Sequence, residues 1–301
     1  MGICFSFNAT TVSNIVFFWK EMSYNQNMKF HFHFKVIFII IFTTLIGFSV
    51  AFTLTNRNAM KFVADVIDNL SHPEFYQALA NPSVRYIKVA EGLRKEEIES
   101  ALDDKFNWTA TDTADFLGHD EYRQSKFEGK YFPDVYLIPR DASGAEVKQM
   151  MNQRFNQNYA EIKSSISTST VNTDKVLTIA SIIQREAAGK SDMNLISGII
   201  WNRIFKGMPL QMDATLQYVK GNEEEWWPDV LSKDKKLDSP YNTYQNKGLP
   251  PSPIANAGLA AITAALNPQK TDCLYYLHSK GQIYCSKTYA EHLKNIEKYL
   301  K

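Results

Sequence analysis

The sequence has little of what cofactor, metal and nucleic-acid sites require. It contains six histidines, none at the spacing of zinc ligands, and no glycine-rich segment of the kind that binds phosphate groups. Its 33 basic and 32 acidic residues nearly balance, so no strong positive field favours nucleic acid as a partner. We therefore expect no cofactor, no metal and no nucleic-acid partner.

Cysteine is also scarce, and three cysteines leave one unpaired if a disulfide forms. Cys273 and Cys285 flank a predicted hairpin, in which residues 274–278 turn at 279–281 into residues 282–284. The hairpin brings the two cysteines near one another, and a bridge would suit a protein outside the cytoplasm. Their spacing does not establish the bond.

A long apolar run covers residues 36–54 and contains no charged residue. At about 1.5 Å per residue, a helix of this length spans roughly 28 Å, close to the hydrocarbon thickness of a bilayer. We predict a transmembrane helix at 36–55. A cleaved signal peptide is the alternative, because the small residues at 49–51 offer a cleavage site.

The flanks of this run suggest an orientation. Lys20, Lys29 and Lys35 precede the run, and a basic excess on that side favours a cytoplasmic N-terminus at 1–35. The remainder of the chain would then face away from the cytoplasm. Met28 begins an ordinary charged lead into the run, so the true start is either Met1 or Met28.

An acid lies on the apolar stripe of a predicted helix at 176–187. Glu186 follows Ile183 by three residues and shares the column of apolar side chains. Burial disfavours the charged form of a carboxyl and raises its pKa, as a group that donates a proton near neutral pH requires. The alternative is a structural glutamate, either paired with an arginine, because such pairs also perturb pKa values, or reaching water at the helix end.

Several sequence blocks follow this helix in order. Gly189 ends it, and a second helix begins near Met193 and stops at Gly207. Three further blocks lie at 207–218, 239–244 (Ser-Pro-Tyr-Asn-Thr-Tyr) and 248–258. Over roughly 174–301, with weaker support at 127–134, the chain resembles the YceG-like family, the MltG endolytic murein transglycosylases.

This resemblance implies an activity and a catalytic residue. Glu186 matches the glutamate with which a lytic transglycosylase cleaves the bond between MurNAc and GlcNAc in peptidoglycan glycan strands, leaving 1,6-anhydro-MurNAc ends. The muramyl 6-hydroxyl is the nucleophile, so one glutamate can serve as acid and then as base without a second carboxylate. The resemblance also implies a bacterial cytoplasmic membrane location, with peptidoglycan synthases or division proteins as partners.

The later blocks supply candidate substrate-binding residues. In the family these positions line the cleft, so the resemblance implies contact with sugar; here they are Gln211, Asp213, Thr215, Tyr241, Asn242, Thr243 and Tyr244. Asn202, three residues after Ile199 on the second helix, is expected to face inward and orient Glu186. Asp213 as a turn cap and the tyrosines as core residues are the simpler interpretations.

Two other functions remain open from the sequence. The first is a hydrolytic muramidase, in which Asp213 is a second carboxylate that activates water or attacks directly. The second is a non-catalytic membrane tether that binds peptidoglycan and recruits synthases. The ends of the released fragments distinguish a transglycosylase from a hydrolase, and the absence of cleavage would identify the tether.

Strands and helices mix without regular βαβ repetition, so the predicted fold class is α+β. The expected parts are a transmembrane helix, a membrane-proximal region at 56–140 and a mixed α+β catalytic domain at 141–301. The membrane-proximal region has a strand at 84–89, helices at 94–102 and 110–117, and an aromatic turn at 127–136. Its segment 87–93 is similar to the opening of a LysM-like subdomain, which implies glycan contact; a small α+β spacer is the alternative.

The rest of the predicted catalytic domain is helical apart from the hairpin. A linking helix followed by a polar stretch is expected at 141–172. Asn256 is expected to cap a helix that runs through Leu266, and a closing helix is expected at 289–299.

Overall fold

The computed structural model describes residues 81, 83–118, 127–165 and 172–300. The predicted cytoplasmic segment 1–35, the transmembrane helix at 36–55, both candidate starts and most of the region up to residue 82 lie outside these residues. Within the described ranges, every helix is too short or too polar to cross a membrane. The described residues belong to one compact unit that begins at Gln77.

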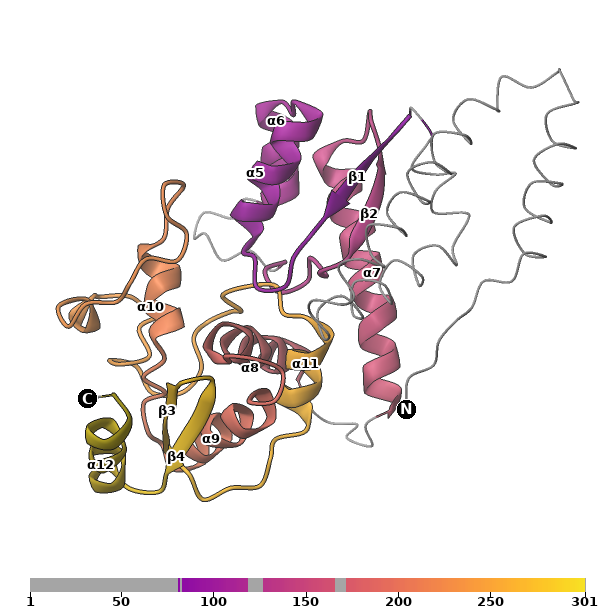
Figure 1. Cartoon of the computed structure of the whole chain (residues 1–301). Helices are drawn as coiled ribbons and strands as arrows, with labels where there is room; N and C mark the ends of the chain where they lie inside the picture. Colours follow the sequence, from indigo (N-terminus) through magenta and orange to yellow (C-terminus); the bar gives the residue numbers. More distant parts are fainter. Residues whose placement is uncertain (1–80, 82, 119–126, 166–171, 301) are drawn as a thin grey trace, which may run out of the picture. The chain divides into compact units, whose positions relative to one another are not determined.

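A small α+β subdomain forms the first part. β1 (Val84–Lys88) pairs antiparallel with β2 (Val135–Pro139), with Tyr86 opposite Leu137. Helices α5 (Lys95–Phe106), α6 (Ala110–Leu117) and α7 (Gly144–Ser165) accompany the two strands (Figure 1). The predicted strand at 84–89 and helix at 110–117 are confirmed, and the helix expected at 94–102 extends to Phe106.

The aromatic turn expected at 127–136 is only partly correct, because its end belongs to β2. Within β2, Tyr136 and Ile138 are buried while Val135 and Leu137 are half-buried, which is the alternation of a strand with one face on a core. The strand was missed because its alternation covers only five residues next to residues typical of turns. Its pairing partner, β1, is about fifty residues away in sequence, so no local signal revealed the pairing.

The core of the small subdomain joins both strands to all three helices. Its buried side chains include Ile87, Ile98, Leu102, Phe116, Tyr131, Ile138, Val147 and Met151. The hydroxyl of Tyr131 donates to the backbone oxygen of Phe116 at 2.5 Å, so its polar end is satisfied inside the core. Gly144 lets α7 start against α6, because a Cβ there would lie 1.9 Å from the backbone oxygen of Asp112.

Four helices build the second part around a separate core, to which α7 also contributes Phe155, Tyr159 and Ile162. α8 (Thr173–Glu186) packs on α9 (Met193–Phe205) and on α11 (Leu259–Leu266), and it also contacts α10 (Asp213–Lys220). The side chain of Asn172 accepts from the backbone amide of Lys175 and so caps α8. The two helices predicted from the apolar spacing are confirmed, whereas α10 was not predicted.

A hairpin and a closing helix complete the chain. β3 (Tyr275–Ser279) pairs with β4 (Gln282–Ser286), and α12 (Tyr289–Leu300) packs against both strands (Figure 1). Lys280 and Gly281 both have positive φ, 51° and 74°, as a two-residue type I′ turn requires. The predicted hairpin and closing helix are confirmed.

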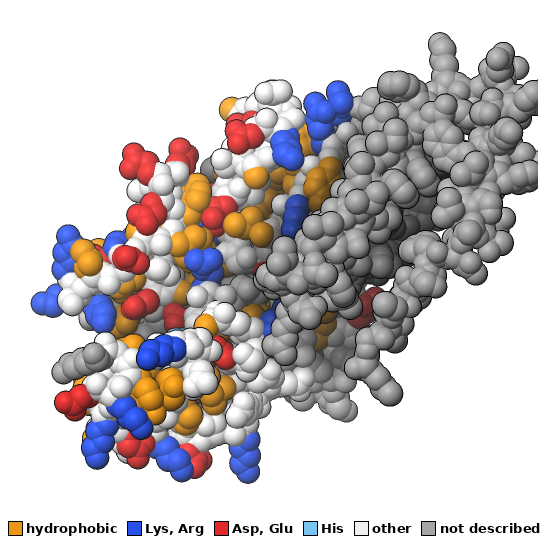
Figure 2. Space-filling view, viewed as in Figure 1, with side chains coloured by type: hydrophobic (Ala, Val, Ile, Leu, Met, Phe, Trp, Pro, Cys, Tyr) orange, Lys and Arg blue, Asp and Glu red, His pale blue; other side chains and the backbone are white. Residues whose placement is uncertain are grey.

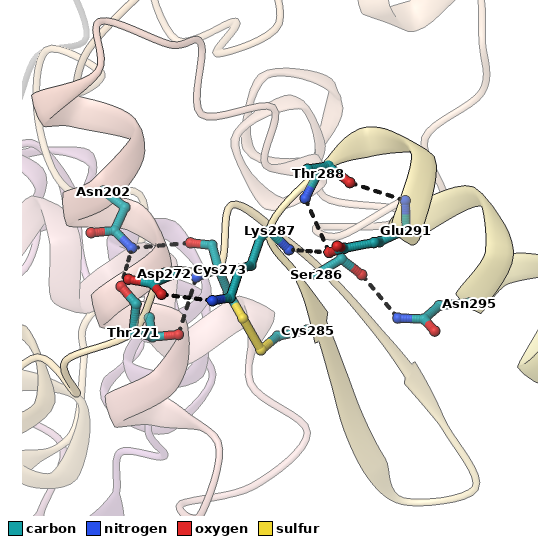
Figure 3. Close-up of a disulfide and its surroundings, with 10 residues drawn as sticks. All are labelled: Asn202, Thr271, Asp272, Cys273, Cys285, Ser286, Lys287, Thr288, Glu291 and Asn295. Carbon is teal, nitrogen blue, oxygen red and sulfur yellow. Dashed lines mark hydrogen bonds and ion pairs between the residues drawn. A yellow bond between two sulfur atoms is a disulfide. The ribbon is translucent and has the colours of Figure 1, made fainter.

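The bond that the sequence left open is present. Cys273 and Cys285 form a disulfide whose Cα atoms lie 5.8 Å apart (Figure 3). Cys285 lies opposite Tyr276 in the hairpin ladder, and Cys273 lies two residues before the start of β3. The disulfide therefore fastens the start of the hairpin to its returning strand.

The predicted cap of α11 is wrong, because Gly258 occupies the cap position and Asn256 has another role. The amide nitrogen of Asn256 donates to Leu93 O at 3.1 Å and to Glu128 Oε1 at 2.9 Å. Its amide oxygen accepts from the backbone nitrogen of Tyr131 at 2.9 Å. Asn256 thus joins the second part of the chain to the small subdomain.

We call this buried polar contact the seam, made of Leu93, Lys95, Glu128, Tyr131 and Asn256. The backbone nitrogen of Lys95 donates to Glu128 Oε2 at 3.3 Å, so both oxygens of this carboxyl accept hydrogen bonds. Burial, reinforced by the charge of Glu96, raises the pKa of Glu128 to about 8. The seam is a largely buried polar network in which burial favours the protonated form of the carboxyl.

Acidic and basic side chains are interspersed on the described surface in the view of Figure 2. No large patch of one sign covers this face of the described residues. This distribution agrees with the near balance of charges in the composition.

Candidate active site

Glu186 is the last residue of α8, and two other elements contact its carboxyl group. Oε1 accepts a hydrogen bond from the backbone nitrogen of Ala214, at the start of α10, at 3.1 Å. Oε2 accepts a hydrogen bond from the hydroxyl of Tyr276 on β3 at 2.7 Å. These two hydrogen bonds fix the position of the carboxyl group. Glu186 as a whole is half-buried, so part of the residue stays exposed.

The environment of Glu186 favours its protonated form. Burial raises the pKa of Glu186 above its ordinary value, and the negative charge of Asp213 raises it further. The hydrogen bonds from Tyr276 and Ala214 and the charge of His278 oppose this shift without cancelling it. None of the ion pairs in the described part of the chain includes Glu186, so the pairing with an arginine is not found there. The other structural alternative, a glutamate that reaches water at the helix end, agrees with the place of Glu186 at the end of α8.

Three of the predicted substrate residues lie on the segments around this carboxyl. Asp213 opens α10 and is exposed, and the hydroxyl of Tyr244 donates to its Oδ1 at 2.5 Å. Gln211 is also exposed, and its backbone, at φ 52°, donates to Thr243 O at 3.0 Å. Gln211 and Asp213 are therefore available to a ligand, and Tyr244 is half-buried beside them.

The two predicted threonines are not available to a ligand. Thr215 and Thr243 are buried, and their hydroxyl oxygens lie 2.9 Å apart. The hydroxyl of Thr243 accepts from the backbone nitrogen of Met212 at 3.0 Å, and that of Thr215 donates to Met212 O at 2.8 Å. The prediction that they bind sugar is wrong for this structure: they satisfy the backbone of the segment that carries Gln211 and Asp213.

Asn242 and Tyr241 likewise support the loop rather than face a ligand. Asn242 is buried, and its amide nitrogen donates to Leu237 O at 2.7 Å. Tyr241 is 9% exposed, its hydroxyl shares a hydrogen bond with Ser252 Oγ at 2.6 Å, and its ring lies 5.2 Å from that of Tyr218. The simpler interpretation of Tyr241 as a core residue is correct.

The prediction for Asn202 also requires correction. Its amide nitrogen donates to Thr271 O at 2.8 Å and to Cys273 O at 3.0 Å, as Figure 3 shows. Asn202 therefore connects α9 to the segment that enters the hairpin, and its amide bonds do not reach Glu186. Helical periodicity placed Asn202 on an inward face, but it could not identify the neighbouring segment, which is about seventy residues away in sequence.

Comparison with known proteins agrees with this geometry. The model of the YceG-like family matches residues 57–298. The chain belongs to the YceG-like family. A crystal structure of a YceG-like protein from Listeria monocytogenes has a TM-score of 0.62 and 30% sequence identity, and the match covers 71% of this chain and 76% of that one. The mixed α+β fold is that of this family.

Two curated relatives carry a named activity. This YceG-like chain is 38% identical over 213 residues to the endolytic murein transglycosylase of Bacillus subtilis, covering 68% of this chain and 58% of that protein. It is 30% identical over 179 residues to the endolytic murein transglycosylase of Streptococcus pneumoniae, covering 58% of this chain and 32% of that protein. The chain thus spans between a third and three fifths of the length of these relatives.

Sequence reasoning missed the aromatic contribution of the hairpin to this YceG-like site. Tyr276 and His278 alternate along β3, so they occupy the same face of the strand, and their rings meet edge to face at 5.7 Å. His278 Nε2 lies 3.1 Å from Asp192 Oδ2, at the start of α9. The period-two pattern of the hairpin was a usable signal, but the direction of that face depended on packing against α8 and α9.

Within the described ranges, no group of three or more histidine, cysteine, aspartate or glutamate side chains is arranged to hold a metal ion.

Proposed function

We propose that this protein is a lytic transglycosylase that cleaves the MurNAc–GlcNAc bond within peptidoglycan glycan strands and leaves 1,6-anhydro-MurNAc ends. The observation that carries the proposal is the carboxyl of Glu186. It is half-buried, its pKa is raised, and its two oxygens are held by Ala214 and Tyr276. The names of the curated relatives support the same activity.

The reaction needs only this carboxyl and the substrate. Protonated Glu186 donates its proton to the glycosidic oxygen while the bond from the muramyl anomeric carbon to that oxygen breaks. The carboxylate then accepts the proton of the muramyl 6-hydroxyl, whose oxygen forms the new bond to the anomeric carbon. Glu186 ends protonated as it began, and no water is consumed.

Asp213 assists through its charge in this proposal. Its negative charge raises the pKa of Glu186, so it helps to keep the acid protonated before the reaction. The same charge also favours the positive character that develops at the muramyl ring. Asp213 is exposed and accepts from Tyr244, and we assign it, with Gln211 and Tyr244, to substrate binding.

The placement of the enzyme in the cell belongs to the same proposal. We infer that residues 36–55 anchor the chain in the bacterial cytoplasmic membrane as a single helix, with the catalytic part outside the cytoplasm. The uncharged apolar run and its basic N-terminal flank support this inference. From this position the enzyme would cut nascent strands near peptidoglycan synthases or division proteins and terminate their elongation.

The small subdomain is the second proposed glycan contact. We infer that the LysM-like part of region 56–140 binds the strand on which the catalytic domain acts. Support comes from the resemblance of segment 87–93 to the opening of such a subdomain and from the seam, which holds this subdomain directly on the catalytic part.

Mass spectrometry of released fragments tests the proposed activity. Uncrosslinked glycan strands are incubated with the whole chain, either wild type or Glu186→Gln. We expect anhydro-muramyl ends from the wild type and none from the variant. Free reducing ends would indicate the hydrolase, with Asp213 as second carboxylate. Binding without cleavage by either folded protein would indicate the tether.

A further inference from the structure

The two oxygens of Glu186 have hydrogen-bond donors of different kinds. Oε1 accepts from a backbone N–H, that of Ala214, which has a fixed direction and can only donate. Oε2 accepts from the hydroxyl of Tyr276, which can rotate and can donate or accept. The two oxygens are therefore not equivalent as carriers of a proton.

The Tyr276 hydroxyl also has a second acceptor within reach. Its oxygen lies 3.6 Å from Met212 Sδ, and a thioether sulfur is a weak acceptor. When Glu186 is ionised, the hydroxyl donates to Oε2 at 2.7 Å. When Oε2 carries a proton, that proton and the hydroxyl hydrogen of Tyr276 would point at each other. The hydroxyl can avoid this repulsion by turning its hydrogen toward the sulfur.

No comparable rearrangement is open at Oε1. A carboxyl O–H accepts more weakly than a carboxylate oxygen, so a proton on Oε1 would weaken the bond from Ala214. That amide opens α10 and has no rotatable hydrogen with which to find another acceptor. The proton of neutral Glu186 therefore belongs on Oε2.

We propose that Tyr276 is a positioning residue that places the transferable proton of Glu186 on Oε2 and follows its protonation state by turning between Oε2 and Met212 Sδ. This inference rests on the proposed function, in which Glu186 acts first as acid and then as base. The hydroxyl stabilises the carboxylate formed after proton donation and releases it when the proton returns. Burial and the neighbouring Glu186 hold the pKa of Tyr276 well above its usual range, so the phenol itself stays protonated throughout.

The hairpin holds Tyr276 in this position from several sides. Tyr276 lies opposite Cys285, whose disulfide to Cys273 closes the hairpin. Its ring contacts that of His278, which is fixed by Asp192 at 3.1 Å. The phenol oxygen is thus set by the strand, the disulfide and the contact of His278 with Asp192 rather than by Glu186 alone.

Other charged and titratable groups face Glu186 and also influence its titration. They come from α8, α9, α10, the loop before α11 and β3, and they are Arg185, Arg203, Asp213, Tyr244 and His278. The test must therefore change the Tyr276 hydroxyl alone, because removal of any of these charges would also move the pKa of Glu186.

The test is the titration of the Glu186 carboxyl in wild type and in Tyr276→Phe, followed by carbon-13 NMR of labelled glutamate. The signal of Glu186 is assigned by its loss in Glu186→Gln. Loss of the donor to Oε2 should raise the pKa of Glu186 by about one unit, because hydrogen bonds to a charged group are the strong ones. The alkaline limb of the rate profile should move to higher pH by the same amount.

Two further variants make the test specific. Tyr284→Phe removes a hydroxyl from the adjacent strand, where it donates to Gln282 at 2.8 Å, and should leave the titration of Glu186 unchanged. Met212→Leu keeps the volume but removes the sulfur, which destabilises the turned hydroxyl. The pKa of Glu186 should then fall by a few tenths of a unit, opposite in sign to the effect of Tyr276→Phe.

Each outcome bears on one claim. An unchanged titration in Tyr276→Phe, or an equal shift in Tyr284→Phe, would overturn the positioning role. An unchanged or raised pKa in Met212→Leu would overturn the turn toward the sulfur. The titration requires no turnover, so a protein that shows the shifts but cleaves no glycan contradicts the proposed function and not the role of Tyr276.

Discussion

Glu128 and Glu186 both have raised pKa values for the same primary reason, burial, yet their surroundings differ. Glu128 is 2% exposed in the seam, and both of its oxygens accept from amide groups, those of Lys95 and Asn256. Glu186 is half-buried, and one of its oxygens accepts from a rotatable hydroxyl. A raised pKa alone therefore does not identify a catalytic acid.

The two glutamates differ in their access to solvent and in whether a hydrogen-bond partner can rotate when the carboxyl changes its charge. The seam surrounds Glu128 with protein on every side, so a protonated carboxyl there holds two parts of the chain together. The site around Glu186 leaves exposed polar side chains, Gln211 and Asp213, on the adjoining segment. A buried network that is fully satisfied favours one structure, whereas an acid that must change its charge needs a partner that can change with it.

The largest expected effect separates the two glutamates by their chemistry. Glu186→Gln should lower the rate of anhydro-end formation by about a thousandfold or more, because the same group serves as acid and as base. Glu128→Gln, the matched substitution, should retain cleavage. Both rates are measured on uncrosslinked strands after thermal melts establish that each variant is folded. Equal losses in the two variants would remove the distinction between the sites.

Asn256→Ala should lower the stability of the protein strongly, whereas Glu186→Gln should lower its activity. It leaves Glu128 Oε1, the Tyr131 amide and one bond to Leu93 without their partner. Each unsatisfied buried group costs about 1–3 kcal/mol, so we expect a decrease of about 3 kcal/mol in the free energy of unfolding. Urea denaturation measures it. A decrease below about 0.5 kcal/mol would mean that the seam contributes little.

The disulfide should affect the site of Glu186 more than the seam. Closing a loop with a sequence separation of 12 contributes about 3 kcal/mol in the chain-entropy model. The double variant Cys273→Ser, Cys285→Ser should lose about 2–3 kcal/mol. The double variant should also cleave glycan more slowly at temperatures well below its melting temperature, because the hairpin positions Tyr276 beside Glu186.

Asn256→Ala, compared at the same fraction folded, is the control for the disulfide variant. If both variants lost activity only in proportion to unfolding, the hairpin would have no separate role in placing Tyr276.

A pH dependence of stability that comes from Glu128 is the most gradual of the expected effects, because it is spread over several pH units. Its pKa is about 8 when folded and about 4.5 as the ordinary value. Below 4.5 both states are protonated and the stabilisation is complete. Between 4.5 and 8 only the unfolded chain releases the proton, so stability falls as pH rises, by up to about 1.4 kcal/mol per unit. Above pH 8 both states have released the proton, so Glu128 causes no further change in stability.

Subtracting the urea-derived stability of Glu128→Gln from that of the wild type between pH 5 and pH 9 isolates this contribution. We expect the difference to decrease with rising pH. A difference that stays constant would mean that Glu128 is ionised in the folded protein.

Much of the fold was predictable because local patterns carried it. The apolar spacing of 176–187 and 193–204, the strand at 84–89 and the turn at Lys280–Gly281 all specified their elements within a few residues. β2 and α10 were missed because a short strand or helix next to turn residues has a weak local signal. Asn256 was misassigned because a residue that can cap a helix can equally well bond across a domain contact.

The site was predictable at its acid but not around it. Glu186 was apparent because burying a carboxyl on an apolar stripe is energetically unfavourable, which suggests a functional role for the residue. The block at 239–244 identified the correct loop, but it could not show that Asn242 and Thr243 point into the protein while Tyr244 reaches Asp213. Tyr276 comes from ninety residues further along, and only tertiary packing brings its hydroxyl to Glu186.

The central claim is that Glu186 alone cleaves the glycan because the nucleophile is part of the substrate. Digestion of glycan strands by the wild-type chain in water enriched in oxygen-18, followed by mass spectrometry of the new muramyl ends, tests it most directly. The account predicts anhydro ends that contain no oxygen-18. One atom of oxygen-18 at each new reducing end would show that water is the nucleophile and would contradict it.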